Sequence, residues 1–160
     1  MRSPFYFIVE PLEGKRYNNS KDISGMDFIT SSSQENHMAS NREAIVISTP
    51  LNYKGPVTKG DTLLVHHNVF KFYYDMKGRE KSGKSYFKDN LFFVDNEQFF
   101  LYKQNDQWFS HYKYCFVEPI PAEESFLMKN FDEEPLMGKM KYPNAYLESK
   151  GVREGMKVGF

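Results

Sequence analysis

Residues 57–65 read VTKGDTLLV, and this stretch decides how the fold of the chain is interpreted. Its KGD step is typical of a turn, and the Thr, Leu and Val residues that follow predict a strand over residues 62–66. The pattern returns loosely as VREGMKVGF at residues 152–160. A turn-and-strand element that occurs twice indicates an internal repeat.

A second pair of matching stretches supports this repeat. VEPL at residues 9–12 recurs as VEPI at residues 117–120, each time at the end of an aromatic strand. The chain therefore begins the same unit again at about residue 117 and stops partway through it at Phe160. We expect one domain over residues 1–120, and residues 121–160 are either a partial second repeat or a C-terminal tail.

The middle of the chain reads as a series of β-hairpins. Lysine interrupts the aromatic runs FKFYY, SYFK, FFLYK and WFSHYKY, and turn signals separate them at short spacing. Aromatic residues make up 17% of the chain and favour strands over helices. No amphipathic helix is predicted before residue 120, so the fold class is all-β, with antiparallel strands in a sheet or barrel.

A long polar segment at residues 13–43 interrupts this β pattern. Its main apolar cluster is Ile23, Met26, Phe28 and Ile29. A segment of this length without periodicity inside a compact domain is usually functional or disordered. We therefore treat it as a candidate binding loop.

The order of these features resembles the GroES co-chaperonin family. VEPL ends an opening strand, the polar loop carries a Gly beside apolar residues, and VTKGDTLL follows a strand with the sequence AIVIS. Hairpins with an acidic turn, DNE at residues 95–97, come next, and the strand in YCFVEP would close a barrel. The resemblance covers residues 5–120, and residues 117–160 as a partial second copy.

The resemblance implies an all-β, antiparallel GroES-like barrel with extended hairpins, followed by an incomplete second β unit. It also implies a homo-oligomeric ring that caps a chaperonin or binds another protein partner, with no enzymatic activity and no cofactor. By position in the loop, Met26 and Phe28 would be the anchors, Gly25 the flexible joint and Ile29 a support. The family usually has a third apolar residue at the position of Asp27, which would weaken docking.

The physics of such a loop leaves two interpretations open. A disordered loop that orders on binding loses entropy and binds with moderate affinity, which a ring recovers through multivalency. The alternative is an ordinary flexible loop whose few apolar residues pack on their own barrel.

GREKSGKS at residues 78–85 matches the phosphate-binding pattern G-x-x-x-x-G-K-[ST]. That chemistry needs a helix N-terminus directed at the phosphates, and the aromatic sequence after the motif predicts a strand. We expect a solvated hairpin tip over residues 78–83 and not a nucleotide site. Its cations Arg79, Lys81 and Lys84 are then candidates for contact with a partner or a neighbouring subunit.

Four residues raise the question of a metal site: His66, His67, His111 and Cys115. Adjacent histidines on one strand point to opposite faces, and the sequence has no paired Cys or His spacing of the zinc type. We therefore predict no metal site.

The remaining alternative is an open barrel of the OB type that binds single-stranded nucleic acid. Lysines interleaved with aromatics suit a basic groove with stacking platforms. However, 21 basic and 21 acidic residues leave no net charge, which disfavours nucleic acid as a partner.

One cysteine allows no internal disulfide, and no apolar run approaches the length that spans a membrane. The composition predicts a cytoplasmic protein without membrane contact. Abundant Phe, Tyr, Asn and Lys would suit an AT-rich genome, such as that of a phage, and then the host cytoplasm.

Overall fold

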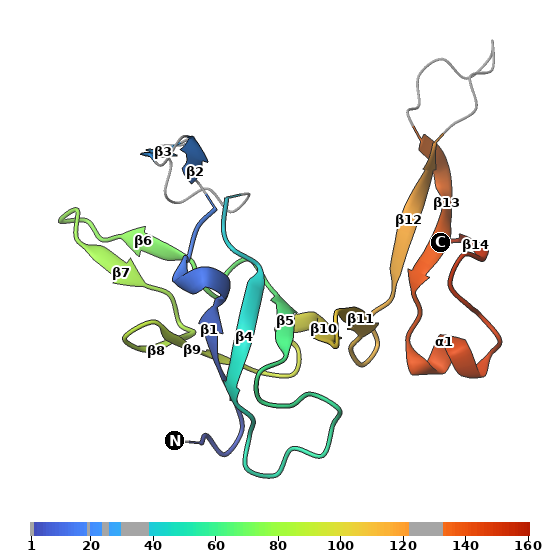
Figure 1. The fold of residues 1–160 in the computed structure, drawn as a ribbon, viewed down its shortest axis with the longest axis horizontal. Coiled ribbons are helices and arrows are strands. Elements are labelled where there is room, and N and C mark those ends of the chain that lie inside the picture. Colours follow the sequence, from blue (N-terminus) through green and yellow to red (C-terminus); the bar gives the residue numbers. More distant parts are fainter. Residues whose placement is uncertain (1, 19, 24–25, 30–38, 122–132) are drawn as a thin grey trace. The chain divides into compact units, whose positions relative to one another are not determined.

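The computed structural model describes residues 2–18, 20–23, 26–29, 39–121 and 133–160, with only the backbone for 20–23 and 26–29. The chain divides into two compact units, Met1–Asn105 and Asp106–Phe160. The second unit therefore begins earlier than the limit at residue 120 that the sequence predicts. Both units consist mainly of antiparallel strands, which confirms the predicted β class (Figure 1).

The main sheet has seven strands in the order β11-β10-β5-β4-β1-β9-β8, and the boundary between the units falls in the turn between β10 and β11. Among the described residues, neither this sheet nor any other closes into a barrel. The strands of the main sheet are β1 (Phe7–Pro11), β4 (Glu43–Ser48), β5 (Thr62–Val65), β8 (Tyr86–Lys88), β9 (Leu91–Val94), β10 (Phe99–Gln104) and β11 (Gln107–Ser110).

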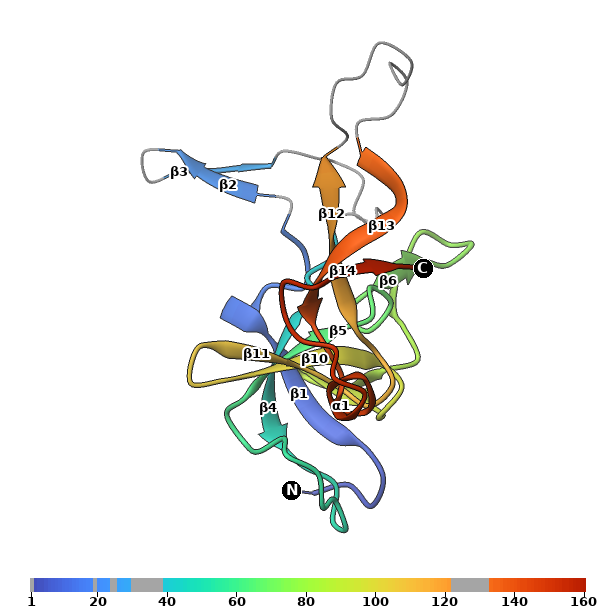
Figure 2. The same cartoon turned by 90° about the vertical axis from the view of Figure 1, so that its right-hand side faces the viewer.

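Two separate hairpins and a short 3₁₀ helix complete the first unit. One hairpin is β2 (Ser20–Ile23) with β3 (Met26–Ile29), and the other is β6 (Phe72–Tyr74) with β7 (Glu80–Ser82). The 3₁₀ helix η1 (Leu12–Gly14) follows β1 directly. Both views draw the β2–β3 pair apart from the main sheet (Figures 1 and 2).

The main sheet is strongly curled. β9 and β10 border opposite sides of the β1, β4 and β5 trio, although only residues 95–98 connect them. This connection is a tight turn, because the Gln98 N–H donates to the Asp95 carbonyl over 3.2 Å. In a flat sheet, four strand spacings of about 4.8 Å would separate β9 from β10 by roughly 19 Å. The trio must therefore bend so that its two borders approach each other.

The concave side of this curled sheet holds the core. Along β4, buried and half-buried residues alternate, as expected when one face of a strand points inward. The rings of Phe7 and Phe99 meet across the core with centroids 5.4 Å apart. The buried cluster is Phe7, Val9, Ala44, Val46, Val57, Leu63, Val65, Val69, Phe70, Phe92, Val94 and Phe99.

The second unit contains a three-stranded sheet in the order β12-β13-β14. After β11, its elements are β12 (Phe116–Pro121), β13 (Glu133–Tyr142), the short helix α1 (Ala145–Ser149) and β14 (Lys157–Gly159). The strand in YCFVEP, expected to close the first barrel, is β12, and it pairs with β13. Its location in the second unit explains why the boundary lies before residue 120.

The sheet of the second unit repeats the strand pairing of β1, β4 and β5. In both units the register shifts by one residue just before the Val of the VEP sequence. The corresponding pairs are Val9–Val46 and Val117–Met140, Glu10–Ile45 and Glu118–Lys139, and Pro11–Ala44 and Pro119–Gly138. The repeat seen in the sequence thus has a counterpart in backbone geometry.

Within the described part of the chain, no helix has both the length and the apolar character needed to span a membrane.

Candidate functional site

The polar segment 13–43 begins and ends at a hydrogen-bonded neck. The Asn18 N–H donates to the Ala39 carbonyl over 2.7 Å, and the Asn41 N–H donates to the Arg16 carbonyl over 3.0 Å. The two ends of the segment are therefore joined before the chain reaches β2 and after it leaves β3.

The buried amide of Asn41 fixes this neck to the sheet. Its Nδ2 donates to the carbonyls of Leu12 and Lys15, over 3.1 Å and 2.8 Å. Its Oδ1 accepts from the Glu43 N–H over 3.0 Å. One side chain thus satisfies three backbone groups where the loop rejoins β4.

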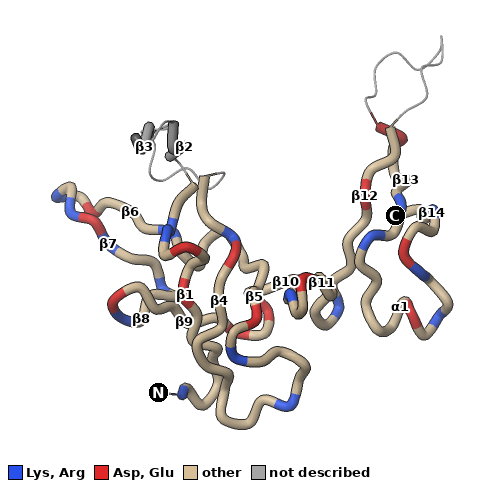
Figure 3. Tube along the Cα trace, viewed as in Figure 1, with Lys and Arg blue, Asp and Glu red and all other residues tan. Residues whose placement is uncertain are grey.

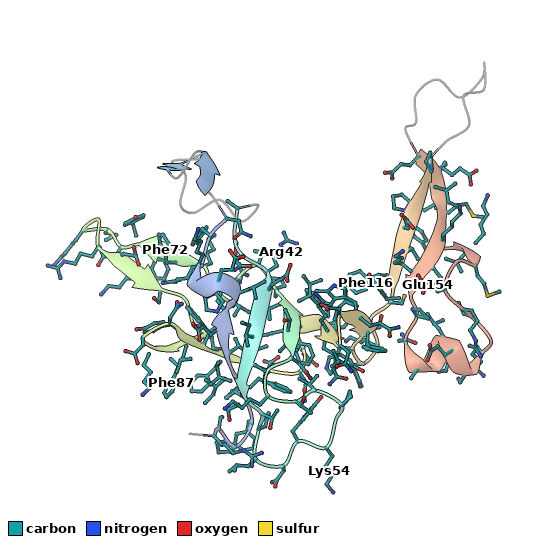
Figure 4. The ribbon with its side chains drawn as sticks, viewed as in Figure 1. Arg42, Lys54, Phe72, Phe87, Phe116 and Glu154 are labelled. Carbon is teal, nitrogen blue, oxygen red and sulfur yellow. The ribbon has the colours of Figure 1, made fainter. Side chains whose placement is uncertain are left out.

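Two hydroxyl groups connect the neck to the segment that leads into β6. The Tyr17 hydroxyl accepts from the Phe72 N–H over 3.1 Å, and the Ser40 hydroxyl donates to the His67 carbonyl over 2.8 Å. Tyr17 and Phe72 also pack edge to face, with centroids 4.9 Å apart. Phe72, labelled in Figure 4, therefore contacts the base of the loop.

Arg16 lies at the centre of this junction. Its Nε donates to the Phe70 carbonyl over 2.9 Å, and its Nη1 donates to the Ser82 hydroxyl over 3.3 Å. The guanidinium also lies over the rings of Phe72 and Phe92, 5.1 Å and 5.2 Å from their centroids. One cation thus joins the neck, the core and the β6–β7 hairpin.

Burial lowers the pKa of Arg16, and the nearby Glu80 carboxylate opposes that shift. The ion pair between them is long, with Nη1 and Oε1 3.9 Å apart. Because the ordinary pKa of arginine lies far above neutral pH, the side chain remains charged there. Hydrogen bonds and aromatic faces, more than this ion pair, compensate for its burial.

Beyond the neck, the predicted partner-binding residues Met26, Phe28 and Ile29 form β3. β3 pairs only with β2 among the described residues. Gly25, the predicted joint, lies outside the described residues. We call the β2–β3 hairpin the arm.

The register of the arm divides its residues into two sets of positions. Ile23 pairs with Met26, and Asp22 pairs with Asp27. Paired residues of a two-stranded ribbon share a register position, and successive positions alternate between its two faces. Asp27 therefore occupies a different set of positions from Met26 and Phe28, and the pairing adds Asp22 to the set of Asp27 and Ile23 to the set of Met26.

The basic residues predicted at one hairpin tip are distributed over three places. The tip of β6–β7 is a turn at residues 75–79, where the N–H groups of Lys77 and Arg79 donate to Asp75 Oδ1 over 2.8 Å and 2.9 Å. Arg79 lies at this tip, Lys81 lies within β7, and Lys84 lies in the following turn. Figure 3 shows positive charge at the tip. The turn precedes the predicted range 78–83 because the Asp75 side chain forms it.

GREKSGKS folds as a turn, a strand and a second turn. Gly78 has a φ of +70°, residues 80–82 form β7, and β8 begins directly after Ser85. Ser85 is buried, and its carbonyl accepts from the Phe93 N–H over 2.7 Å. Strand β8 therefore stands where a phosphate-binding loop has its helix.

The two adjacent histidines do not lie on a strand, as the sequence argument assumed. β5 ends at Val65, and the rings of His66 and His67 lie side by side with centroids 4.1 Å apart. Among the described residues, no three side chains of the His, Cys, Asp and Glu types lie close enough together to hold a metal ion.

The pattern analysis missed Arg16 and Asn41, because neither belongs to a motif. Only their positions near the two ends of the polar segment 13–43 could have drawn attention to them. Comparisons with protein-family models, curated proteins and solved structures found no match.

Proposed function

We propose that this chain is a non-enzymatic, co-chaperonin-like β protein that binds a chaperonin or another protein partner through the arm. The likeness of the first unit to a GroES-like barrel belongs to this proposal. The observation that carries it is the neck. Three hydrogen bonds between the Asn41 side chain and the backbone, together with the half-buried Arg16, fix the base of a hairpin whose strands pair only with each other among the described residues.

The register of the arm supports a binding role. Ile23, Met26 and Phe28 occupy one set of alternating positions, together with Lys21, whereas the other set holds Asp22, Asp27, Ser20 and the predicted support Ile29. A ribbon with apolar residues along one set of positions can lie on an apolar groove and keep its carboxylates in water. Such an arm binds with moderate affinity, which several copies in one assembly would raise.

The test measures binding of the full chain to a purified chaperonin by biolayer interferometry. Met26→Asp combined with Phe28→Asp should weaken binding by about tenfold or more, because both anchors are lost. Asp22→Asn is the matched control on the other set of positions and should leave binding within about twofold. Equal binding by the double variant, or a monomeric chain without chaperonin affinity, would refute the proposal.

A second candidate function is binding of single-stranded nucleic acid on the β6–β7 hairpin. Tyr73 is 50% exposed and pairs in register with Lys81, so a ring and a cation share one face. An exposed ring beside a cation is the arrangement that stacks bases without sequence preference.

This candidate is tested by the fluorescence anisotropy of a labelled oligothymidine at low salt. Tyr73→Ala should reduce affinity by about 1–3 kcal/mol, the usual contribution of one stacked base. Tyr146→Ala, which removes another exposed tyrosine, is the control. If the anisotropy does not rise when the unmodified chain is added, nucleic-acid binding on this hairpin is ruled out.

A further inference from the structure

The turn before β14 repeats the turn before β5. The Gly60 N–H donates to the Val46 carbonyl over 2.8 Å, and the Gly155 N–H donates to the Met140 carbonyl over 2.7 Å. Both glycines have left-handed backbones, with φ of +96° and +83°. Together with the shared register of the strands, this identifies β12-β13-β14 as a structural copy of β1-β4-β5.

One face of this copied sheet is charged. Glu118 pairs with Lys139, and Lys139 pairs with Lys157, so the three side chains form a row across β12, β13 and β14. All three are exposed. Glu118 and Lys139 carry opposite charges, whereas Lys139 and Lys157 carry like charges, and the ammonium of Lys157 lies 2.7 Å from the Glu134 carboxylate. A row of exposed charged side chains is typical of a solvated face.

The other face of the copied sheet is apolar and incompletely covered. Val117 and Val158 are half-buried, and Phe160 is 70% exposed. Their counterparts by register in the first unit are Val9, Leu63 and Val65, each 0% exposed. Met140, which pairs with Val117 as Val46 pairs with Val9, is also buried, at 4% exposure. The same strand trio therefore buries its whole apolar face in the first unit and leaves it partly open in the second, at Val117, Val158 and Phe160.

The first unit shows what covers this kind of face. β9 pairs with the outer edge of β1, and β10 pairs with the outer edge of β5. Phe92 and Val94 of β9 and Phe99 of β10 are fully buried on the inner side. The face is thus covered by one tight hairpin. Its two strands, β9 and β10, pair with the two edges of the trio and carry bulky residues at alternate positions.

We propose that the apolar face and the open edges of β12-β13-β14 bind a β-hairpin of another polypeptide, one with aromatic and branched residues at alternate positions. Among the described residues, β12 and β14 each have a strand neighbour on one side only. The incoming strands would add to these edges, and their bulky residues would cover Val117, Val158 and Phe160. This site is independent of the arm, so neither proposal depends on the other.

The test adds a synthetic peptide with the sequence of residues 89–104 to the full chain. This peptide has the required chemistry, since it carries the hairpin that covers the first unit. Hydrogen–deuterium exchange should slow in Phe116–Pro121 and Lys157–Gly159. Exchange in Phe7–Pro11 should not change, because β1 already has strands on both sides.

Variants and a second peptide identify the face that binds. Val117→Lys should weaken peptide binding by about tenfold or more, and Lys139→Gln on the charged face should leave it within about twofold. A peptide with Ser at the positions of Phe92 and Val94 should not protect β12. Lack of protection by the original peptide would overturn the proposal. It would also be overturned by a dimer in light scattering whose β12 is protected without peptide, since a second copy would then be the occupant.

Discussion

Arg16 shows how a single residue connects parts of the chain that are distant in sequence. Its hydrogen-bond acceptors Phe70 and Ser82 lie 54 and 66 residues further along. Its planar guanidinium contacts a carbonyl, a hydroxyl and two aromatic faces. A lysine has neither the plane nor the fork needed for these contacts.

Arg16→Ala should therefore destabilise the protein by roughly 2–4 kcal/mol, through lost packing and an unpaired buried carbonyl. Arg79→Ala at the exposed tip is the control and should change the free energy of unfolding by less than about 0.5 kcal/mol. Urea unfolding followed by circular dichroism measures both. Similar midpoints for the two variants would contradict this account of the junction.

Tyr53 offers a prediction about pH at the same scale. Its ring packs edge to face on Phe7, with centroids 4.8 Å apart, and burial raises the pKa of its phenol. Above about pH 10 the unfolded chain releases this proton before the folded chain does, so stability falls as the pH rises.

Tyr53→Phe should make the stability of the protein less sensitive to pH between about 9.5 and 11. Tyr146→Phe, on an exposed ring of α1, is the control and should leave the dependence as it is in the unmodified chain. Thermal unfolding at several pH values measures the slope. An unchanged slope in Tyr53→Phe would show that this phenol is not a source of the pH dependence.

At the scale of elements, short-range chemistry decides where the hairpins turn. The β6–β7 turn is organised by the Asp75 carboxylate, which accepts from two N–H groups of the turn. Such a side-chain mimic of a backbone turn is the usual role of Asp before Gly in a tight connection.

Asp75→Ala should weaken the β6–β7 hairpin by roughly 0.5–1.5 kcal/mol, since the turn loses two acceptor contacts. Hydrogen exchange of residues 72–82 should become faster, whereas exchange in β1 stays the same. Asp75→Asn retains an acceptor oxygen and should behave more like the unmodified chain. Equal exchange in all three proteins would mean that strand pairing alone holds the hairpin.

At the scale of the whole molecule, the two units use one strand trio with different degrees of cover. Val9 and Val117 are the same residue type at corresponding register positions, but Val9 is fully buried and Val117 is half-buried. The loss of stability when a Val→Ala substitution removes two methyl groups depends on how completely neighbouring atoms surround those groups.

Val9→Ala should lower the free energy of unfolding by roughly 2–3 kcal/mol, and Val117→Ala should lower it by less than about 1 kcal/mol. Urea-dependent hydrogen exchange, read separately over β1 and β12, measures the two effects without assuming that the units unfold together. Equal costs would show that the face of the second unit is covered in solution, which light scattering could then trace to self-association.

The sequence by itself determined the β class, the hairpin series and the repeat, because these depend on alternation and turn residues within a few positions. It also identified Met26, Phe28 and Ile29 as the apolar part of the polar segment. Only the tertiary structure decided that β12 belongs to the second unit, that Arg16 and Asn41 fix the neck, and that one apolar face is left open. Those features depend on contacts between residues tens of positions apart, and no local pattern encodes which distant backbone group a side chain will meet.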